Sequence, residues 1–370
     1  MKNYALSVQK LAHFLIALTL GTYILIVSKS ILVPLMFGAF FAAMLIPLSN
    51  FFETATQNRV SAILLSFLTI LVPVLGITSL FAYQIVRVIN DMPNVRDKID
   101  SGIYQLVHWL GGQLGQREEA IQSWLTENLS GGMSDFLPES LSSLSSVIAG
   151  LLLTIIFTFF WMLYRTSLKN YALYQFDDFA RRRADLAITQ IRRISQKYLY
   201  GLLVVILILG GLNSLGLWII GVDYALFWGF LGAFLAIIPY VGTTLGGLFP
   251  FLYSLATADS WWQPVSVVIL YTSIQSIEGN FITPKIVGNS VKINPFAAIL
   301  ALLVGGAVWG IAGLILALPV IAIIRIVFMH IEALKPVSEL LSENLYKNEA
   351  VFEKKYNENR YRILNYFKDS

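Results

Sequence analysis

The sequence of 370 residues contains no cysteine. Disulfide bonds, thiolate metal sites and thiol catalysis are therefore excluded. Charged residues are also scarce, at 13% of the chain, whereas an ordinary soluble domain carries about 25%. The formal net charge of +4 is too small to indicate a nucleic-acid partner.

Enzyme signatures are missing as well. The three histidines, His13, His108 and His330, lie far apart, and the chain contains no H-E-x-x-H, G-x-S-x-G or P-loop motif. We therefore expect no enzyme, no catalytic residue, no metal site and no cofactor.

Long apolar runs without charge are what the chain does contain, and hydrophobic residues make up 56% of it. A membrane span needs about 20 helical residues, and six runs meet that need: 11–28, 30–52, 60–86, 147–164, 198–222 and 261–277. No small-x-small cleavage site follows the first run, so we expect a retained span. Lys29 alone separates the first two runs, which predicts a tight helical hairpin.

The distribution of basic residues predicts the orientation. Residues 165–197 carry eight basic and three acidic side chains, whereas 91–139 carry only three basic ones. Basic loops stay in the cytoplasm, so both termini are expected inside and residues 91–146 outside. The outer segment has helical periodicity and predicts a small amphipathic helical cap, with a solvated connector as the alternative.

Two further uncharged stretches, residues 224–258 and 293–324, are too long for one span and too short for two. Each is interrupted near its middle, the first at Pro239–Gly247 and the second at Gly305–Gly310. Such segments favour re-entrant hairpins, whose non-helical tips must be buried in protein or line a cavity. Single long spans are the alternative.

The sequence therefore predicts an all-α, polytopic transmembrane protein with about eight hydrophobic segments. Its expected organisation is N-terminal transmembrane helices 1–3 in residues 1–90, the extracytoplasmic segment 91–146, transmembrane helices and hairpins with a cytoplasmic basic segment in 147–334, and a cytoplasmic charged helical tail in 335–370.

Polar and small residues at membrane depth are the candidates for a substrate or ion path. A carboxylate inside a bilayer has to be paired, protonated or hydrated, and Glu278 ends an apolar helix; an interfacial cap is its alternative role. The other candidates are Gln275, Asn280, Asn213, Pro239, Tyr240, Gly242, Thr243 and Thr244. Close helix packing is the alternative role for the glycine, and a helix–helix hydrogen bond is the alternative for Asn213.

Several motifs in the C-terminal half resemble the AI-2E transporter family. They are Ile238-Pro239-Tyr240-Val241-Gly242, Glu278-Gly279-Asn280-Phe281-Ile282-Thr283-Pro284-Lys285-Ile286-Val287-Gly288, Ile293-Asn294-Pro295, and the glycine-rich run Gly305–Gly313 followed by Pro319. We expect a structural role for the motif residues Pro284, Gly288, Asn294, Pro295, Gly306, Gly310 and Gly313.

The resemblance implies a bacterial inner-membrane protein that forms a homo-oligomer, with a pentamer as one such assembly. It also implies either export of the quorum-sensing signal autoinducer-2 or sodium/proton antiport. Our leading expectation is a secondary transporter that exports a small hydrophilic solute such as autoinducer-2. The alternatives are a sodium/proton antiporter and a non-transporting membrane scaffold.

Overall fold

The computed structural model describes residues 8–114, 146–238, 241–258, 260–282, 285–286, 292–343, 345, 350–358 and 361, with the backbone alone for 89–114 and 241. In these residues the chain is helical and contains no β-strand. Seven of the described helices are long and apolar enough to cross a membrane. The predicted class, an all-α polytopic membrane protein, is confirmed.

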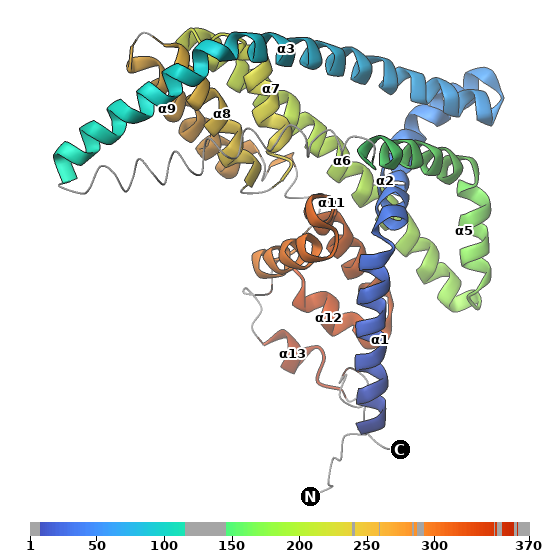
Figure 1. Cartoon of the computed structure of the whole chain (residues 1–370). Coiled ribbons are helices and arrows are strands. Elements are labelled where there is room, and N and C mark those ends of the chain that lie inside the picture. Colours follow the sequence, from blue (N-terminus) through green and yellow to red (C-terminus); the bar gives the residue numbers. More distant parts are fainter. Residues whose placement is uncertain are drawn as a thin grey trace, which may run out of the picture. The chain divides into compact units, whose positions relative to one another are not determined.

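Two helices begin the described chain, α1 (Val8–Val27) and α2 (Lys29–Thr56). Only Ser28 separates them; its amide donates to the carbonyl of Ile24, and its carbonyl accepts from the amide of Leu32. The helical i to i+4 hydrogen-bond pattern therefore runs through the junction, and Figure 1 shows α2 continuing from the end of α1. The predicted tight hairpin at this place is wrong, because one lysine without glycine or proline does not end a helix.

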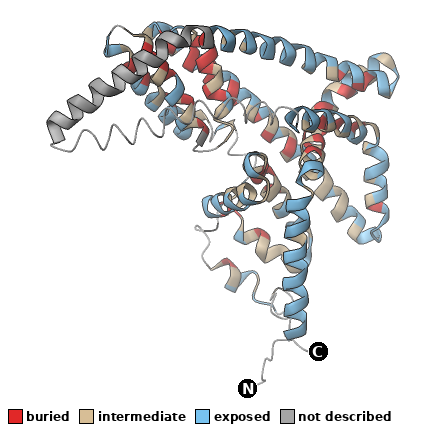
Figure 2. Ribbon diagram, in the orientation of Figure 1, coloured by how far each residue is buried: buried red, intermediate tan, exposed pale blue. Residues whose placement is uncertain are grey.

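Helix α1 is exposed along its whole length and contains no buried residue (Figure 2). Its side chains are nevertheless mostly apolar, which suits a surface covered by lipid rather than water. This exposure agrees with a membrane-embedded first segment.

The helices that follow are longer than the predicted spans. Helix α3 (Arg59–Leu114) includes the predicted span 60–86 and continues through the first part of the predicted cap; residues 115–145 of that cap lie outside the described residues. The next helices are Ser146–Leu163, α5 (Arg165–Tyr174) and α6 (Asp178–Ile220). Helix α6 joins the basic segment to the apolar span without a break.

The chain divides into two compact units, each assembled from separate stretches of sequence. The first contains residues 1–66, 152–202 and 285–370, and the second contains 67–151 and 203–284. Helices α3 and α6 each contribute to both units.

In the second unit, α7 (Ala225–Leu235) and α8 (Val241–Thr257) form a helical hairpin. The two backbones meet at Gly232 and Gly246, where a Cβ atom added to Gly246 would lie 2.8 Å from the Cα of Gly232. Helix α9 (Trp262–Ile277) and a short π-helix, η1 (Glu278–Ile282), follow.

The interruption between α7 and α8 does not extend as far along the chain as the sequence predicts. Helix α7 ends at Leu235, and the chain is helical again from Val241. Gly242, Thr243 and Thr244 therefore belong to α8, and their carbonyls are not freed by a non-helical tip. The predicted extent of the break, through Gly247, is wrong because glycines paired for close packing are tolerated inside membrane helices.

In the first unit, α11 (Pro295–His330) also folds back on itself. Gly310 has φ 60° and ψ −136°, a backbone conformation that favours glycine. A Cβ on Gly305 would lie 2.6 Å from the carbonyl oxygen of Gly313, whereas residues eight apart in a straight helix are about 12 Å apart. The break is confined to Gly310, so the predicted non-helical run from Gly305 is wrong; Gly306 is helical and faces Leu314.

The two ends of α11 meet the same short helix, α12 (Lys335–Leu340). Asn294 donates through Nδ2 to the carbonyl of Leu340 at 2.7 Å, and Arg325 donates through Nε to the carbonyl of Ser338 at 3.3 Å. A straight helix from residue 294 to 325 would separate these ends by about 45 Å. The hairpin geometry of α11 is therefore fixed by contacts at its base as well as at its tip. The 3₁₀-helix η3 (Glu332–Leu334) and helix α13 (Val351–Lys354) complete the described tail.

The core of the second unit consists of large apolar side chains from α3, α6, α7, α8 and α9. Trp228 lies at its centre, with ring centroids 4.9 Å from Phe227 and 5.3 Å from Tyr253. Phe81 of α3 packs on Phe227 at 5.4 Å. The buried members are Val88, Leu217, Val222, Ala225, Phe227, Trp228, Tyr253 and Val267. This aromatic core holds the α7–α8 hairpin against its neighbours.

Candidate functional site

A small cavity lies among α6, α7, α8 and α9 in the second unit. Its volume is about 20 Å³, which is room for roughly one water-sized particle. The lining residues are Leu209, Asn213, Gly232, Ala236, Thr243, Tyr271, Ile274 and Gln275. Three predicted path residues, Asn213, Thr243 and Gln275, are thus brought together from three helices.

Small residues let these helices approach closely enough to enclose the cavity. A Cβ on Gly247 of α8 would lie 3.2 Å from the ring of Tyr271 on α9, and one on Gly210 of α6 would lie 2.6 Å from the ring of Phe230 on α7. Side chains in place of these hydrogens would push the helices apart. The glycines thus set the dimensions of the cavity.

Asn213 is the most informative of the lining residues. It is 5% exposed, and its Oδ1 atom is buried without a hydrogen-bond partner among the described residues. An unsatisfied buried acceptor costs about 1–3 kcal/mol. Oδ1 therefore makes no helix–helix hydrogen bond with a described residue, and it belongs to a residue that lines the cavity.

Gln275 connects the cavity to the carboxylate of Glu278. Its side-chain Nε2 donates to Oε2 of Glu278 at 2.7 Å, and Gln275 also lines the cavity. Glu278 opens the π-helix η1, so it lies one turn beyond Gln275 on the same face of the helix. A polar chain thus runs from the cavity to a titratable group.

The other predicted path residues are placed differently. Thr244 is exposed and does not line the cavity, and Gly242 is buried where a Cβ would collide with the backbone of Leu235. Asn280 is exposed and donates through Nδ2 to the carbonyl of Ser276, near the end of α9, at 2.8 Å. Pro239 and Tyr240 lie outside the described residues.

Sequence reasoning missed Tyr271, although a signal for it was present. Tyr271, Gln275 and Glu278 are spaced four and three residues apart, which places them on one helix face. The hydroxyl of Tyr271 donates to the carbonyl of Trp228 at 3.4 Å. The apolar lining residues Leu209 and Ala236 carried no comparable signal.

The start of α9 gives an estimate of the depth of the cavity. Trp261 is 49% exposed and Trp262 is 70% exposed, and exposed tryptophans mark the membrane–water interface. Tyr271 and Gln275 follow Trp262 by nine and 13 residues, which is about 14 and 20 Å along a helix. In a hydrocarbon core about 30 Å thick, the cavity lies near mid-depth.

The predicted structural residues act at the base and tip of the α11 hairpin. Asn294 caps α11, since its Oδ1 accepts from the amide of Ala297 at 2.8 Å, and Pro295 occupies the first turn. Gly313 packs against the backbone of Gly305. Pro284 and Gly288 lie outside the described residues. The described part of the chain contains no group of three or more His, Asp or Glu side chains that could hold a metal ion.

The fold and the cavity define a class: a polytopic helical membrane protein with two helical hairpins and a small cavity, lined in part by polar side chains, among its helices. The profile described as AI-2E family transporter matches residues 13–333. The chain therefore belongs to the AI-2E transporter family, and the sequence resemblance is confirmed.

Three relatives extend over most of the chain. YrrI of Bacillus subtilis (strain 168) is 28% identical over 82% of this chain and 88% of its own length. YueF of the same strain is 27% identical over 67% and 69%, and YhhT of Escherichia coli (strain K12) is 23% identical over 81% and 84%. The names of all three propose a transport role without stating a substrate. Family and relatives together support a multi-pass membrane transport protein.

Proposed function

We propose that this chain is a secondary transporter of the bacterial inner membrane that exchanges a small cation for protons. In this proposal the cavity among α6, α7, α8 and α9 holds the cation, and Glu278 exchanges the proton. Sodium is the cation that we expect, because the polar lining groups are oxygen donors and hard cations prefer oxygen ligands.

The observation that carries the proposal is the unpartnered Oδ1 of Asn213 in a cavity of about 20 Å³. Thr243, Tyr271 and Gln275, which also carry oxygen atoms in their side chains, belong to the same lining. A cation bound there would satisfy the buried acceptor and offset its desolvation cost. An organic solute with five carbon atoms requires a volume several times larger, so the present dimensions favour an ion.

The bond between Gln275 and Glu278 supplies the coupling. An ionised Glu278 accepts the Nε2 donor of Gln275, which leaves the amide oxygen of Gln275 as a ligand. Protonation of Glu278 weakens this charge-assisted hydrogen bond and releases the amide. Cation binding and protonation therefore oppose each other, as exchange requires.

The test is proton movement in proteoliposomes that contain a pH-sensitive dye and receive a sodium gradient. Wild-type protein should move protons in response to sodium, and Glu278→Gln should abolish the movement. Thr243→Val should reduce it strongly, whereas Thr244→Val, one residue away and outside the cavity, should leave it near the wild-type level. Equal activity of the two threonine variants would refute the assignment of the cavity.

Export of autoinducer-2 is the second candidate, and family membership is the observation in its favour. The same proteoliposomes, loaded with autoinducer-2, distinguish it. Efflux without sodium dependence and with full activity in Glu278→Gln would favour the exporter. Absence of both fluxes would favour the membrane scaffold.

We also propose cytoplasmic N- and C-termini and a homo-oligomeric, for example pentameric, assembly. The basic segment 165–197 supports this orientation. The exposed apolar surface of α1 supports a lipid or subunit contact. Neither statement is needed for the exchange mechanism.

A further inference from the structure

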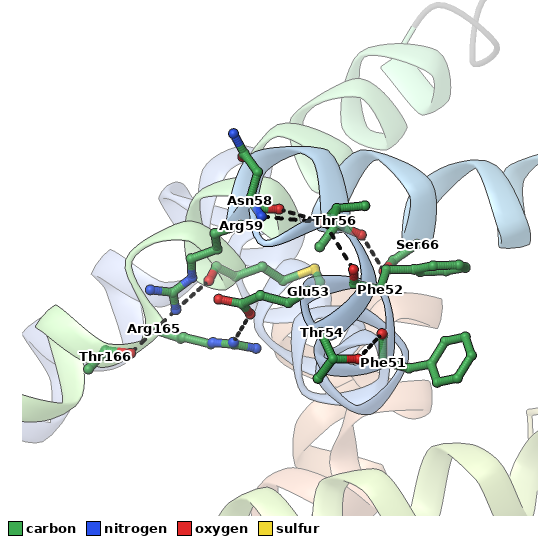
Figure 3. A network of polar contacts seen from close by, with 12 residues as sticks. Phe51, Phe52, Glu53, Thr54, Thr56, Asn58, Arg59, Ser66, Arg165 and Thr166 are labelled. Atoms are coloured by element: carbon green, nitrogen blue, oxygen red, sulfur yellow. Dashed lines mark hydrogen bonds and ion pairs between the residues drawn. The ribbon is translucent and has the colours of Figure 1, made fainter.

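A second polar site lies in the first unit, where three apolar helices end (Figure 3). Helix α2 ends at Thr56, α3 begins at Arg59, and the helix Ser146–Leu163 ends just before Arg165. The ends of membrane helices gather at the boundary between hydrocarbon and water. Arg165 also opens the basic segment, which places this boundary on the expected cytoplasmic side.

Two guanidinium groups and one carboxylate lie at this boundary. Arg165 forms an ion pair with Glu53 through Nη2 and Oε2 at 2.7 Å. Arg59 forms no ion pair with a described residue; its Nη2 donates to the carbonyl of Met162 at 3.2 Å and to Oγ1 of Thr166 at 3.4 Å. The group of Glu53, Arg59 and Arg165 therefore carries a formal charge of +1. The charge without an ion-pair partner among the described residues is that of Arg59, whose side chain is positioned by its two hydrogen bonds.

Donors in this group remain unsatisfied. Nε of Arg59 and Nη1 of Arg165 are buried and have no hydrogen-bond partner among the described residues. A guanidinium presents its donors in a fork that matches the oxygen atoms of a phosphate group. An anion with several oxygen atoms would satisfy both the charge and the donors.

Exposed aromatic residues lie close to the group in the sequence. Phe51 is 68% exposed, and the rings of Phe160 and Tyr164 stack with centroids 6.0 Å apart. Aromatic belts mark the depth of the lipid headgroups. The unpaired cation thus lies where lipid phosphates lie.

We propose that Arg59 and Arg165 form a binding site for a phosphate group at the membrane surface, supplied by an anionic phospholipid. Glu53 restrains the site by competing with the phosphate for Arg165. The proposal is independent of the exchange mechanism, since these residues belong to the first unit and the cavity belongs to the second.

The test is lipid binding to the purified full chain in detergent, measured by native mass spectrometry during titration with phosphatidylglycerol or phosphatidylcholine. Wild type should prefer phosphatidylglycerol. Arg59→Gln should weaken that binding about fivefold, since one basic side chain near a membrane surface contributes about 1 kcal/mol. Glu53→Gln should strengthen it, because Arg165 is released. Arg87→Gln, at the far end of the apolar part of α3, is the matched control and should change nothing.

The opposite signs of the two substitutions distinguish binding from folding. If Arg59→Gln and Glu53→Gln both weaken binding, or neither changes it, the proposal is refuted. Arg59→Lys keeps the charge and should retain most of the binding. Retention in this variant would show that the loss in Arg59→Gln is caused by the missing charge and not by misfolding. Inorganic phosphate is the competitor: failure to displace phosphatidylglycerol assigns the site to lipid, whereas displacement with the same dependence on Arg59 assigns it to a free phosphate ion.

Discussion

Replacing Gly246 with alanine should destabilise the α7–α8 hairpin. The added Cβ would lie 2.8 Å from the Cα and 3.1 Å from the carbonyl oxygen of Gly232. Both are backbone atoms, which cannot rotate away, so the two helices must separate. Overpacking of this kind costs about 1–3 kcal/mol, and the better helix propensity of alanine returns about 1 kcal/mol. We therefore expect a net loss of up to about 2 kcal/mol.

Thermal unfolding in detergent, followed by tryptophan fluorescence, measures this change. Trp228 belongs to α7 and to the aromatic core, so its fluorescence reports opening of the hairpin. Gly211→Ala is the matched control, because a Cβ on Gly211 of α6 would meet no atom within 4 Å. Its melting temperature should stay the same or rise.

A functional consequence follows from the same contact. Thr243 lies one helical turn before Gly246, so separation of α7 from α8 also moves a lining residue of the cavity. Gly246→Ala should therefore reduce sodium-driven proton movement more than its loss of stability alone explains. Equal melting temperatures and equal fluxes for the Gly246 and Gly211 variants would refute the packing argument.

Three further predictions concern the hairpins and their orientation. Cysteine introduced at Lys285 of the naturally cysteine-free chain should be labelled from the cytoplasmic side only; labelling from outside would exclude re-entrant hairpins. Gly310→Ala should destabilise α11 by about 1–3 kcal/mol, because its φ of 60° is strained for alanine, and an unchanged melting temperature would contradict this. Asn294→Ala should lower the free energy of unfolding by about 0.5–2 kcal/mol through loss of the helix cap. It should also speed hydrogen exchange in α12, because the bond from Asn294 to the carbonyl of Leu340 is lost. Unchanged exchange would count against a stabilising role for that bond.

The membrane helices could be predicted from the sequence because hydrocarbon selects long uncharged runs. The junction at Ser28 could not. Lys29 suggested a turn, but a single charge does not interrupt backbone hydrogen bonding, and the long side chain of lysine can reach water from a continuous helix. Charge marks where a side chain meets water, and it does not mark where a helix ends.

Glycine in this chain has two roles that the sequence does not separate. Gly310 breaks a helix, since its backbone has a positive φ. Gly246 and Gly305 lie inside helices and allow close contact with Gly232 and Gly313. Both roles produce the same clusters of small residues. The positions of the hairpins were therefore predictable, and the extents of their breaks were not.

The cavity was predictable only in part, for a related reason. A polar residue in an apolar helix is conspicuous, so Asn213, Thr243 and Gln275 could be selected individually. Their common location depends on how α6, α8 and α9 pack against one another, which no local pattern encodes. Tyr271 could have been found from its helical spacing to Gln275.

The buried amide of Asn213 on α6, together with the Gln275–Glu278 bond, gives the strongest reason to connect the cavity with transport. An unsatisfied amide oxygen such as Oδ1 of Asn213 costs about 1–3 kcal/mol when buried, and packing alone would favour an apolar residue of similar size. Near the middle of the membrane no bulk water is present to reduce that cost. The cost is offset when an ion enters. The hydrogen bond from Gln275 to Glu278 then couples ion binding to the protonation of Glu278. If Asn213→Leu raises the melting temperature while abolishing sodium-driven proton flux, the asparagine is there for the ion and not for the fold.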